Sequence, residues 1–197
     1  MTALAISNIV LWIIVLGLLI VVLALTRQLG VLHERITPVG ALMLNKGLTV
    51  GERAPTVEVH DLEGGHLSVG APRSDGRSTL LLFVSPTCPV CKSLLPIVKS
   101  SGRDESRWLD IILASDGNLD EHREYVRANG LANVPYVVSA PLGMTYQVSR
   151  LPFAALLDET GILRARGLVN SREHLESLFE AKRLGVASLQ DYFANAK

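Results

Sequence analysis

The hydropathy pattern begins with an apolar block at the N-terminus. Residues 2–26 contain no charged side chain, and positions 9–25 are apolar throughout. A helix of about 20 such residues can span a bilayer, so the pattern predicts a transmembrane anchor over residues 1–26. A cleavable signal peptide, the alternative, would have basic residues before the apolar stretch and small residues after it. No Lys or Arg precedes Arg27, and residues 25–28 form a poor cleavage site, which favours an uncleaved anchor.

After this block, the chain contains short segments in which apolar and polar residues alternate. Residues 27–50 are interpreted as a connector, and residues 51–197 as one domain. Residues 57–62 alternate as a half-buried strand does, and a turn at 63–66 returns the chain through residues 67–69.

The remaining elements of the domain are predicted from apolar runs and capping residues. Buried strands are expected at 79–85 and 109–114, and Asn118 with Glu121 forms a capping box for a helix that ends near Asn129. The elements expected after this helix are a strand at 134–138, a short helix at 143–149, a hairpin with strands near 151–158 and 162–167, a last helix capped by Asn170 and Glu173, and a weakly helical tail at 185–197. Strands that alternate with helices predict an α/β fold with helices on both faces of a sheet.

Charge and cysteine content narrow the functional classes. The chain has 19 basic and 19 acidic residues and no block of like charge, so it lacks the electrostatic pattern of a nucleic-acid-binding protein. Two cysteines in one motif do not form a disulfide framework, so their number does not decide the compartment.

Those two cysteines, Cys88 and Cys91, are the strongest chemical signal. The predicted strand delivers them to the start of a helix at 92–99, where unpaired N–H groups and the helix dipole stabilise a thiolate at Cys88. Pro89 suits the first turn of that helix, and Cys91, one turn further on, can close a disulfide with Cys88. The motif favours a redox-active dithiol without a metal or cofactor.

Three other interpretations of the Cys pair are weaker. A zinc site would need a second ligand pair, and the five histidines are scattered without the usual spacing. Covalent haem attachment would need His where Lys92 stands. A structural disulfide between residues only three apart would constrain little of the unfolded chain.

Across residues 51–184 the chain resembles thioredoxin-fold proteins. The resemblance rests on the strand–Cys88-x-x-Cys91–helix unit, Pro96 within that helix, and Pro152 at the start of the hairpin about sixty residues later. The entry Gly51-x-x-Ala54-Pro55 and the hairpin 57–69 are similar to the membrane-anchored, extracytoplasmic branch of that family.

This resemblance implies roles for particular residues. Pro152 matches the position of a cis-proline that faces the dithiol, so the bond between Leu151 and Pro152 is expected to be cis. The residues implied in client binding are Thr87 and Pro89 beside Cys88, and Arg150, Leu151 and Pro152 beside the hairpin. Cys88 is expected to be the nucleophile and Cys91 the resolving cysteine.

Two positions depart from ordinary thioredoxin. Thr87 stands where thioredoxin has Trp, and Leu82 stands where it has a buried acidic residue that helps move protons at the second cysteine. Both departures favour a dedicated client over general reduction.

A closer resemblance covers nearly the whole chain. Residues 7–12, 30–42 and 85–96 resemble the MauD family of methylamine utilisation proteins. This resemblance implies an accessory factor for methylamine dehydrogenase, a periplasmic enzyme whose small subunit is rich in disulfides. That subunit is the implied client, and the implied action is thiol–disulfide exchange, with a membrane-embedded electron donor or acceptor as a further partner. The redox direction stays open, as do a tethered chaperone without redox action and a reductase for cytochrome c maturation.

The location follows from two opposing signals. Arg27, Arg35 and Lys46 lie after the apolar block, and the positive-inside rule would keep the following domain in the cytoplasm. Stable client disulfides, however, need an oxidising compartment. The implied client therefore favours an inner-membrane protein with one span and a periplasmic domain.

Overall fold

The computed structural model describes the backbone of residues 2–34 and 48–184 and the side chains of residues 6–22 and 48–184. The chain divides into two compact units, residues 1–45 and 46–197. The connector residues 35–47 and the C-terminal tail 185–197 lie outside the described residues, so the expectations for them stay predictions.

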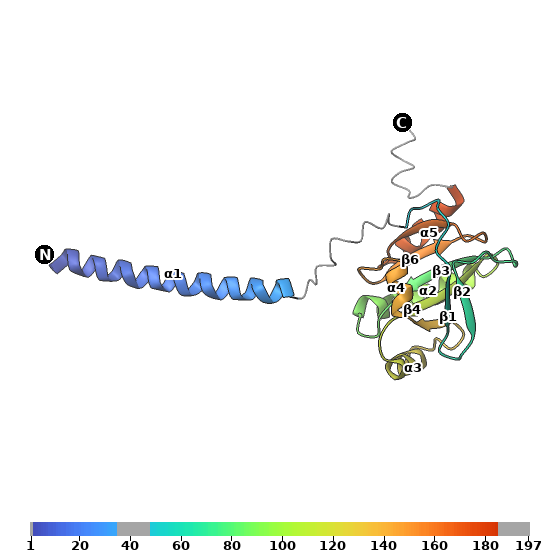
Figure 1. Ribbon diagram of the computed structural model, residues 1–197, viewed down its shortest axis with the longest axis horizontal. Helices are drawn as coiled ribbons and strands as arrows, with labels where there is room; N and C mark the ends of the chain where they lie inside the picture. Colours follow the sequence, from blue (N-terminus) through green and yellow to red (C-terminus); the bar gives the residue numbers. More distant parts are fainter. Residues whose placement is uncertain (1, 35–47, 185–197) are drawn as a thin grey trace, which may run out of the picture. The chain divides into compact units, whose positions relative to one another are not determined.

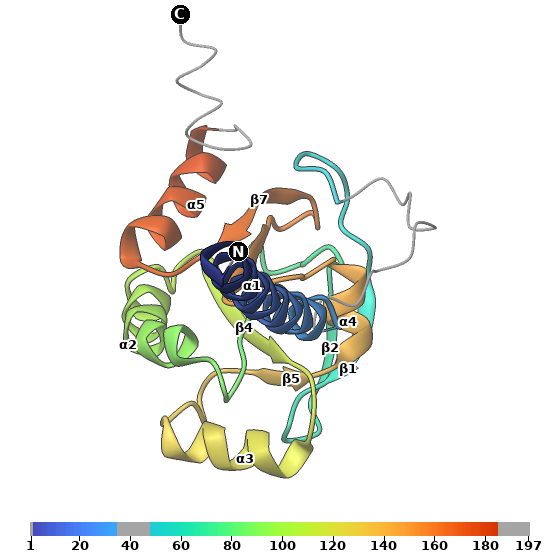
Figure 2. The same ribbon diagram turned by 90° about the vertical axis from the view of Figure 1, so that its left-hand side faces the viewer.

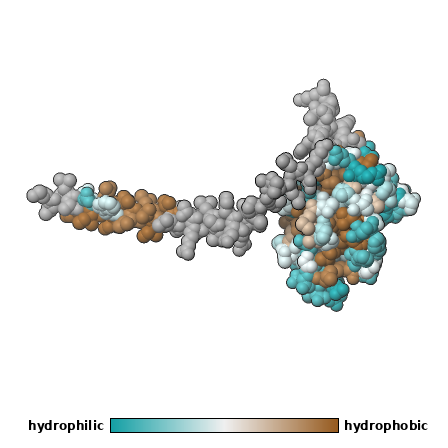
Figure 3. Space-filling view, in the orientation of Figure 1, coloured by the Kyte–Doolittle hydropathy of each residue, from teal (hydrophilic) through white to brown (hydrophobic). Residues whose placement is uncertain are grey.

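The described part of the first unit is helix α1 (Thr2–Glu34), which runs past the expected boundary at residue 26. Its side chains from Ile6 to Val22 are exposed, and most of them are apolar, as the brown surface in Figure 3 shows. Among the residues that the structure describes, no helix is long and apolar enough to cross a membrane. The membrane anchor stays a prediction.

The second unit is built on a five-stranded sheet (Figure 1). Its strands, in spatial order, are β5 (Tyr136–Val138), β4 (Leu109–Ser115), β3 (Ser78–Phe83), β6 (Phe153–Leu157) and β7 (Leu163–Leu168). Strands β3, β4 and β5 are parallel, whereas β6 and β7 run antiparallel to β3 and to each other. A separate hairpin pairs β1 (Val57–His60) with β2 (His66–Val69).

Helices cover both faces of this sheet, as the α/β interpretation expects (Figure 2). The helices are α2 (Pro89–Asp104), α3 (Leu119–Ala128), α4 (Ala140–Thr145) and α5 (Arg172–Leu184). Side chains of β4 alternate between two buried clusters. Leu109, Ile111 and Leu113 pack with α2, α3 and α5. Ile112 and Ala114 pack with α4 and the β1–β2 hairpin.

Three of the boundaries that differ from the expectations have a local cause. Strand β5 begins at Tyr136 instead of residue 134, since Pro135 has no N–H to donate and only its carbonyl accepts, from Leu113 at 2.9 Å. Helix α4 begins at Ala140 instead of residue 143, because the hydroxyl of Ser139 accepts from the N–H of Leu142. Helix α5 is capped one residue later than expected, by Ser171, whose hydroxyl accepts from the N–H of His174 at 3.4 Å.

The β6–β7 turn is organised by a buried carboxylate. Asp158 is 3% exposed; its Oδ1 accepts from the N–H groups of Thr160 and Ile162, and its Oδ2 accepts from Nε of Arg164 at 2.6 Å. Burial raises the pKa of Asp158, but these hydrogen bonds outweigh it and leave the pKa below its ordinary value. The turn ends at Gly161, which has a φ of +81°.

Candidate functional site

Strand β3 positions the cysteine pair. All six residues of the strand are buried, and the N–H of Val84 donates to the carbonyl of Ala114 just beyond it. A short loop follows, in which the N–H of Cys88 donates to the carbonyl of Ser85 and the hydroxyls of Ser85 and Thr87 lie 3.0 Å apart. This loop holds Cys88 at the N-terminus of α2.

Cys88 and Cys91 form a disulfide, with Cα atoms 5.2 Å apart. Cys88 is the N-cap of α2, and its sulfur accepts from the N–H of Cys91 at 3.1 Å. Pro89 occupies the first turn, where its missing N–H costs nothing. Cys88 is half-buried, whereas Cys91 is fully buried. An external sulfur can therefore approach Cys88, while Cys91 can reach only its partner.

The side chains that flank Cys88 are uncharged. Thr87 and Pro89 are exposed on either side of it, and Val90 is 43% exposed. Behind the pair, Leu82 is fully buried in the same cluster as Cys91. The position that is acidic in thioredoxin therefore adds apolar packing here.

Pro152 lies at the same end of the sheet. The peptide bond between Leu151 and Pro152 is cis, which confirms the expectation. Phe153 of β6 pairs with Phe83 of β3, so the loop before Pro152 and the loop before Cys88 meet at one sheet end.

The residues around this bond differ in exposure. Pro152 is buried, and its carbonyl accepts from the N–H of Val169 at 3.0 Å. Leu151 is 38% exposed, and the side chain of Arg150, also exposed, has no ion-pair partner within residues 48–184. The expected client-binding residues therefore form two neighbouring groups, Thr87 with Pro89 and Arg150 with Leu151 and Pro152.

The sequence did not point to a cavity of about 360 Å³ at this sheet end. Helix α4 forms one wall, and the ends of β3 and β4 form another. The local signal nearby, Ser139 followed by Pro141, marks the start of α4 and carries no information about a cavity.

A buried histidine also lies near the end of β4. Nε2 of His122 donates to the carbonyl of Asp116 at 2.8 Å, since a carbonyl can only accept, and Nδ1 accepts from the hydroxyl of Tyr136 at 3.0 Å. Burial raises the pKa of Tyr136 to about 12. Both polar groups are satisfied within the core, which indicates a structural role.

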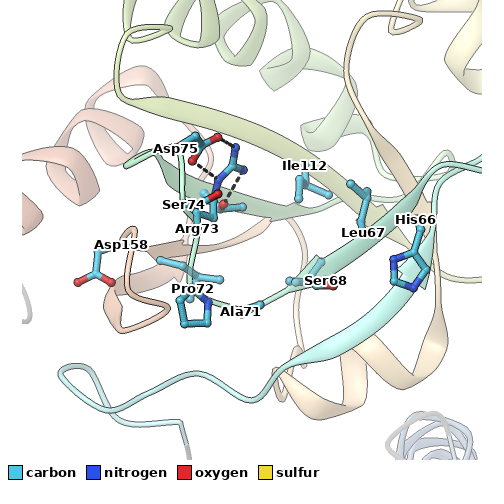
Figure 4. Close-up of a pocket in the computed structure, with 14 residues that line it drawn as sticks. His66, Leu67, Ser68, Ala71, Pro72, Arg73, Ser74, Asp75, Ile112 and Asp158 are labelled. Carbon is cyan, nitrogen blue, oxygen red and sulfur yellow. Dashed lines mark hydrogen bonds and ion pairs between the residues drawn. The ribbon is translucent and has the colours of Figure 1, made fainter.

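A second hollow lies at the other end of β3 (Figure 4). There the side chains of Arg73 and Asp75 point toward each other, and Arg73 also contacts Asp110 at 2.6 Å. The hydrogen bond from Arg73 holds the pKa of Asp75 below its ordinary value. This hollow contains neither cysteine. In the part of the chain that the structure describes, no group of three His, Cys, Asp or Glu residues could hold a metal ion.

Comparisons with known proteins identify full-length relatives. No family model matches the chain. The methylamine utilization protein MauD of Paracoccus denitrificans is 48% identical over 191 residues, which cover 97% of this chain and 94% of that protein. MauD of Methylorubrum extorquens is 44% identical, with 97% and 92% covered, and MauD of Paracoccus versutus is 45% identical, with 100% and 98% covered.

Solved structures agree with the thioredoxin-like fold. The thioredoxin domain of a thiol-disulfide oxidoreductase from Bacteroides vulgatus superposes with a TM-score of 0.57 at 17% identity, covering 68% of this chain and 98% of that one. A thioredoxin-like protein from Aeropyrum pernix gives 0.54 at 14% identity, with 64% and 89% covered.

Proposed function

Because the chain belongs to the MauD family of methylamine utilization proteins, we propose that it is a thiol–disulfide oxidoreductase or isomerase acting in methylamine utilisation. The observation that carries this proposal is the Cys88–Cys91 disulfide at the start of α2, with Cys88 accessible and Cys91 buried. The proposed client is the small subunit of methylamine dehydrogenase.

The chemistry is thiol–disulfide exchange. In the oxidising direction, a client thiolate attacks the Sγ of Cys88, the Cys88–Cys91 bond breaks, and Cys91 leaves as a thiolate. A second thiolate of the client then attacks the client sulfur of this mixed disulfide, and Cys88 leaves as a thiolate. The client gains a disulfide, and two electrons remain on the reduced pair until a membrane-embedded acceptor removes them. In the reducing direction the same steps run backwards, and a membrane-embedded donor supplies the electrons.

The backbone at Leu151 provides a place for the client chain. Its N–H and C=O make no backbone hydrogen bond within the described domain, and its side chain is partly exposed. An extended client segment can pair with these groups as an added strand, which is a general recognition mode. Arg150 and Pro152 would flank that segment on one side, and Thr87 and Pro89 on the other.

The proposal includes a single-span anchor in the inner membrane and a periplasmic domain. Its support is the apolar block before Arg27 and a client chemistry that needs an oxidising compartment. Fusing a reporter that is active only in the periplasm after Lys197 tests this location. Activity is expected; silence, together with activity of a cytoplasm-only reporter at the same position, would contradict the location and the proposed client.

Trapping identifies the client directly. In a Cys91→Ser variant the mixed disulfide at Cys88 cannot be resolved, so the small subunit should co-purify as a reducible adduct. A Cys88→Ser variant is the matched control and should capture nothing. Recovery of a different protein would reassign the client, for example to cytochrome c maturation. Normal subunit maturation with a Cys88→Ser/Cys91→Ser double variant would instead favour a tethered chaperone.

A further inference from the structure

The cavity beside α4 opens at the end of the sheet that carries the dithiol. It has a volume of about 360 Å³, which lies within the range of small-ligand pockets. Phe83 and Val84 line it from the end of β3, and Gly143 and Met144 line it from α4. The end of β4 lines it through residues 114–116, and the segment before Pro152 lines it through residues 148–151.

This cavity is continuous with the edge where the client is proposed to lie. Val84 begins the loop that leads to Cys88 four residues later, and Leu151 immediately precedes Pro152. Because Phe83 pairs with Phe153, these two loops leave adjacent strands at one sheet end. A segment paired with the backbone of Leu151 would therefore pass over the cavity.

Eight of the thirteen lining residues are apolar or glycine, and five are polar or charged: Ser115, Asp116, Ser139, Ser149 and Arg150. Met144 is 68% exposed and Leu151 is 38% exposed, so both leave apolar surface in contact with water. A flexible thioether can adapt to side chains of different shape. At the rim Arg150 is exposed, and its guanidinium can stay solvated while the apolar walls are covered.

We infer that this cavity is the specificity pocket of the oxidoreductase, and that it receives an apolar side chain of the client next to the reacting cysteine. The inference rests on the proposed function. It assigns a client polypeptide with an apolar residue beside its cysteine as the preferred substrate, and it gives Met144, Leu151 and the α4 wall a role in selecting that substrate.

The test uses the full chain in detergent micelles with its dithiol reduced beforehand. Two synthetic peptides each carry one cysteine in a disulfide with glutathione, flanked by leucines in one peptide and by serines in the other. Cys88 attacks the peptide sulfur and glutathione leaves as a thiol. Cys91 then releases the peptide thiol, so the two electrons of the dithiol reduce one disulfide. We expect the leucine peptide to react about tenfold faster, as one apolar contact allows.

Two variants locate the preference. An added Cβ at Gly143 meets no atom within 4 Å, so Gly143→Phe has room to occupy the cavity and should bring the leucine-to-serine rate ratio close to one. Met144→Ser should lower the ratio as well. Leu119→Ser is the matched control: Leu119 is 49% exposed and lines a different hollow, so the ratio should not change.

Glutathione disulfide, which carries no client side chain, separates the two proposals. The unmodified chain and Leu119→Ser should react with it at the same rate, and each protein's peptide rates are divided by its own rate with glutathione disulfide. Equal rates for the two peptides, or a preference that survives Gly143→Phe and Met144→Ser, would overturn the pocket and leave the oxidoreductase function standing. Failure of the unmodified chain to react with glutathione disulfide would overturn the function and the pocket together.

Discussion

Replacing Asp158 by Asn tests how the structure holds the hairpin that follows Pro152. The buried carboxylate accepts hydrogen bonds from two N–H groups, the hydroxyl of Thr160 and Nε of Arg164. An Asn side chain keeps one oxygen for the turn but presents an amide N–H₂ to Arg164, so two donors face each other. A hydrogen bond to a charged group contributes about 1.5–3 kcal/mol.

Because Arg164 is partly exposed, the loss of stability should lie in the lower part of that range. Its side chain is 39% exposed and can turn into water, so we expect a loss of about 2 kcal/mol. For a domain of this size that loss lowers the melting temperature by roughly 4–8 °C. Thermal unfolding of the full chain in detergent, followed by near-ultraviolet circular dichroism, measures the shift.

The control and the pH dependence sharpen this test. Asp120→Asn makes the same chemical change at a side chain that is 88% exposed and paired with Arg123, so it should cost less than about 1 kcal/mol. Since the folded-state pKa of Asp158 is lowered, its stabilisation is present above the unfolded value near 3.9 and is lost as pH falls through the folded value. The Asp158→Asn effect should therefore shrink below about pH 4. Equal shifts for the two variants at pH 7 would refute this reasoning.

Two further predictions concern the core and the same turn. Gly161→Ala should destabilise the domain by about 1 kcal/mol or more beyond Gly64→Ala. Both glycines have positive φ, but only a Cβ at Gly161 would meet another atom closely, the carbonyl oxygen of Gly70 at 2.5 Å. Urea unfolding of both variants measures the difference, and equal losses would contradict it. Tyr136 should ionise near pH 12, so a tyrosinate absorbance titration should lose a late step in Tyr136→Phe. Because the unfolded pKa is near 10, stability should also fall as pH rises from 10 to 12, and identical titrations of the two proteins would refute the assignment.

Local signals explain what could be predicted from the sequence. The Cys pair, Pro89 in the first turn and the cap at Asn118 each act within a few residues, and Asn118 accepts from the N–H groups of Asp120 and Glu121 as expected. The expectation for Pro152 rested on the resemblance to thioredoxin-fold proteins and on the hairpin after it, not on a local signal.

Tertiary contacts explain what could not be predicted. Asn170 and Ser171 are both good capping residues, and the choice of Ser171 accompanies a contact from Arg172 to the hydroxyl of Ser100 in α2 at 2.6 Å. The cavity beside α4 is made by residues from three distant parts of the chain, 83–84, 114–116 and 139–151, so no local pattern could reveal it.

The central proposal is that Cys88 and Cys91 exchange disulfides, with Cys88 as the attacking sulfur. The most direct measurement treats full-chain Cys91→Ser and Cys88→Ser variants with glutathione disulfide and follows the glutathione adduct by mass spectrometry. Cys88 caps α2 and is accessible, whereas Cys91 is fully buried and reacts only when the structure around it opens locally. The adduct should therefore form at Cys88 more than about tenfold faster, since an opening free energy of about 1.4 kcal/mol already gives a factor of ten. Equal rates, or a faster reaction at Cys91, would contradict the proposal.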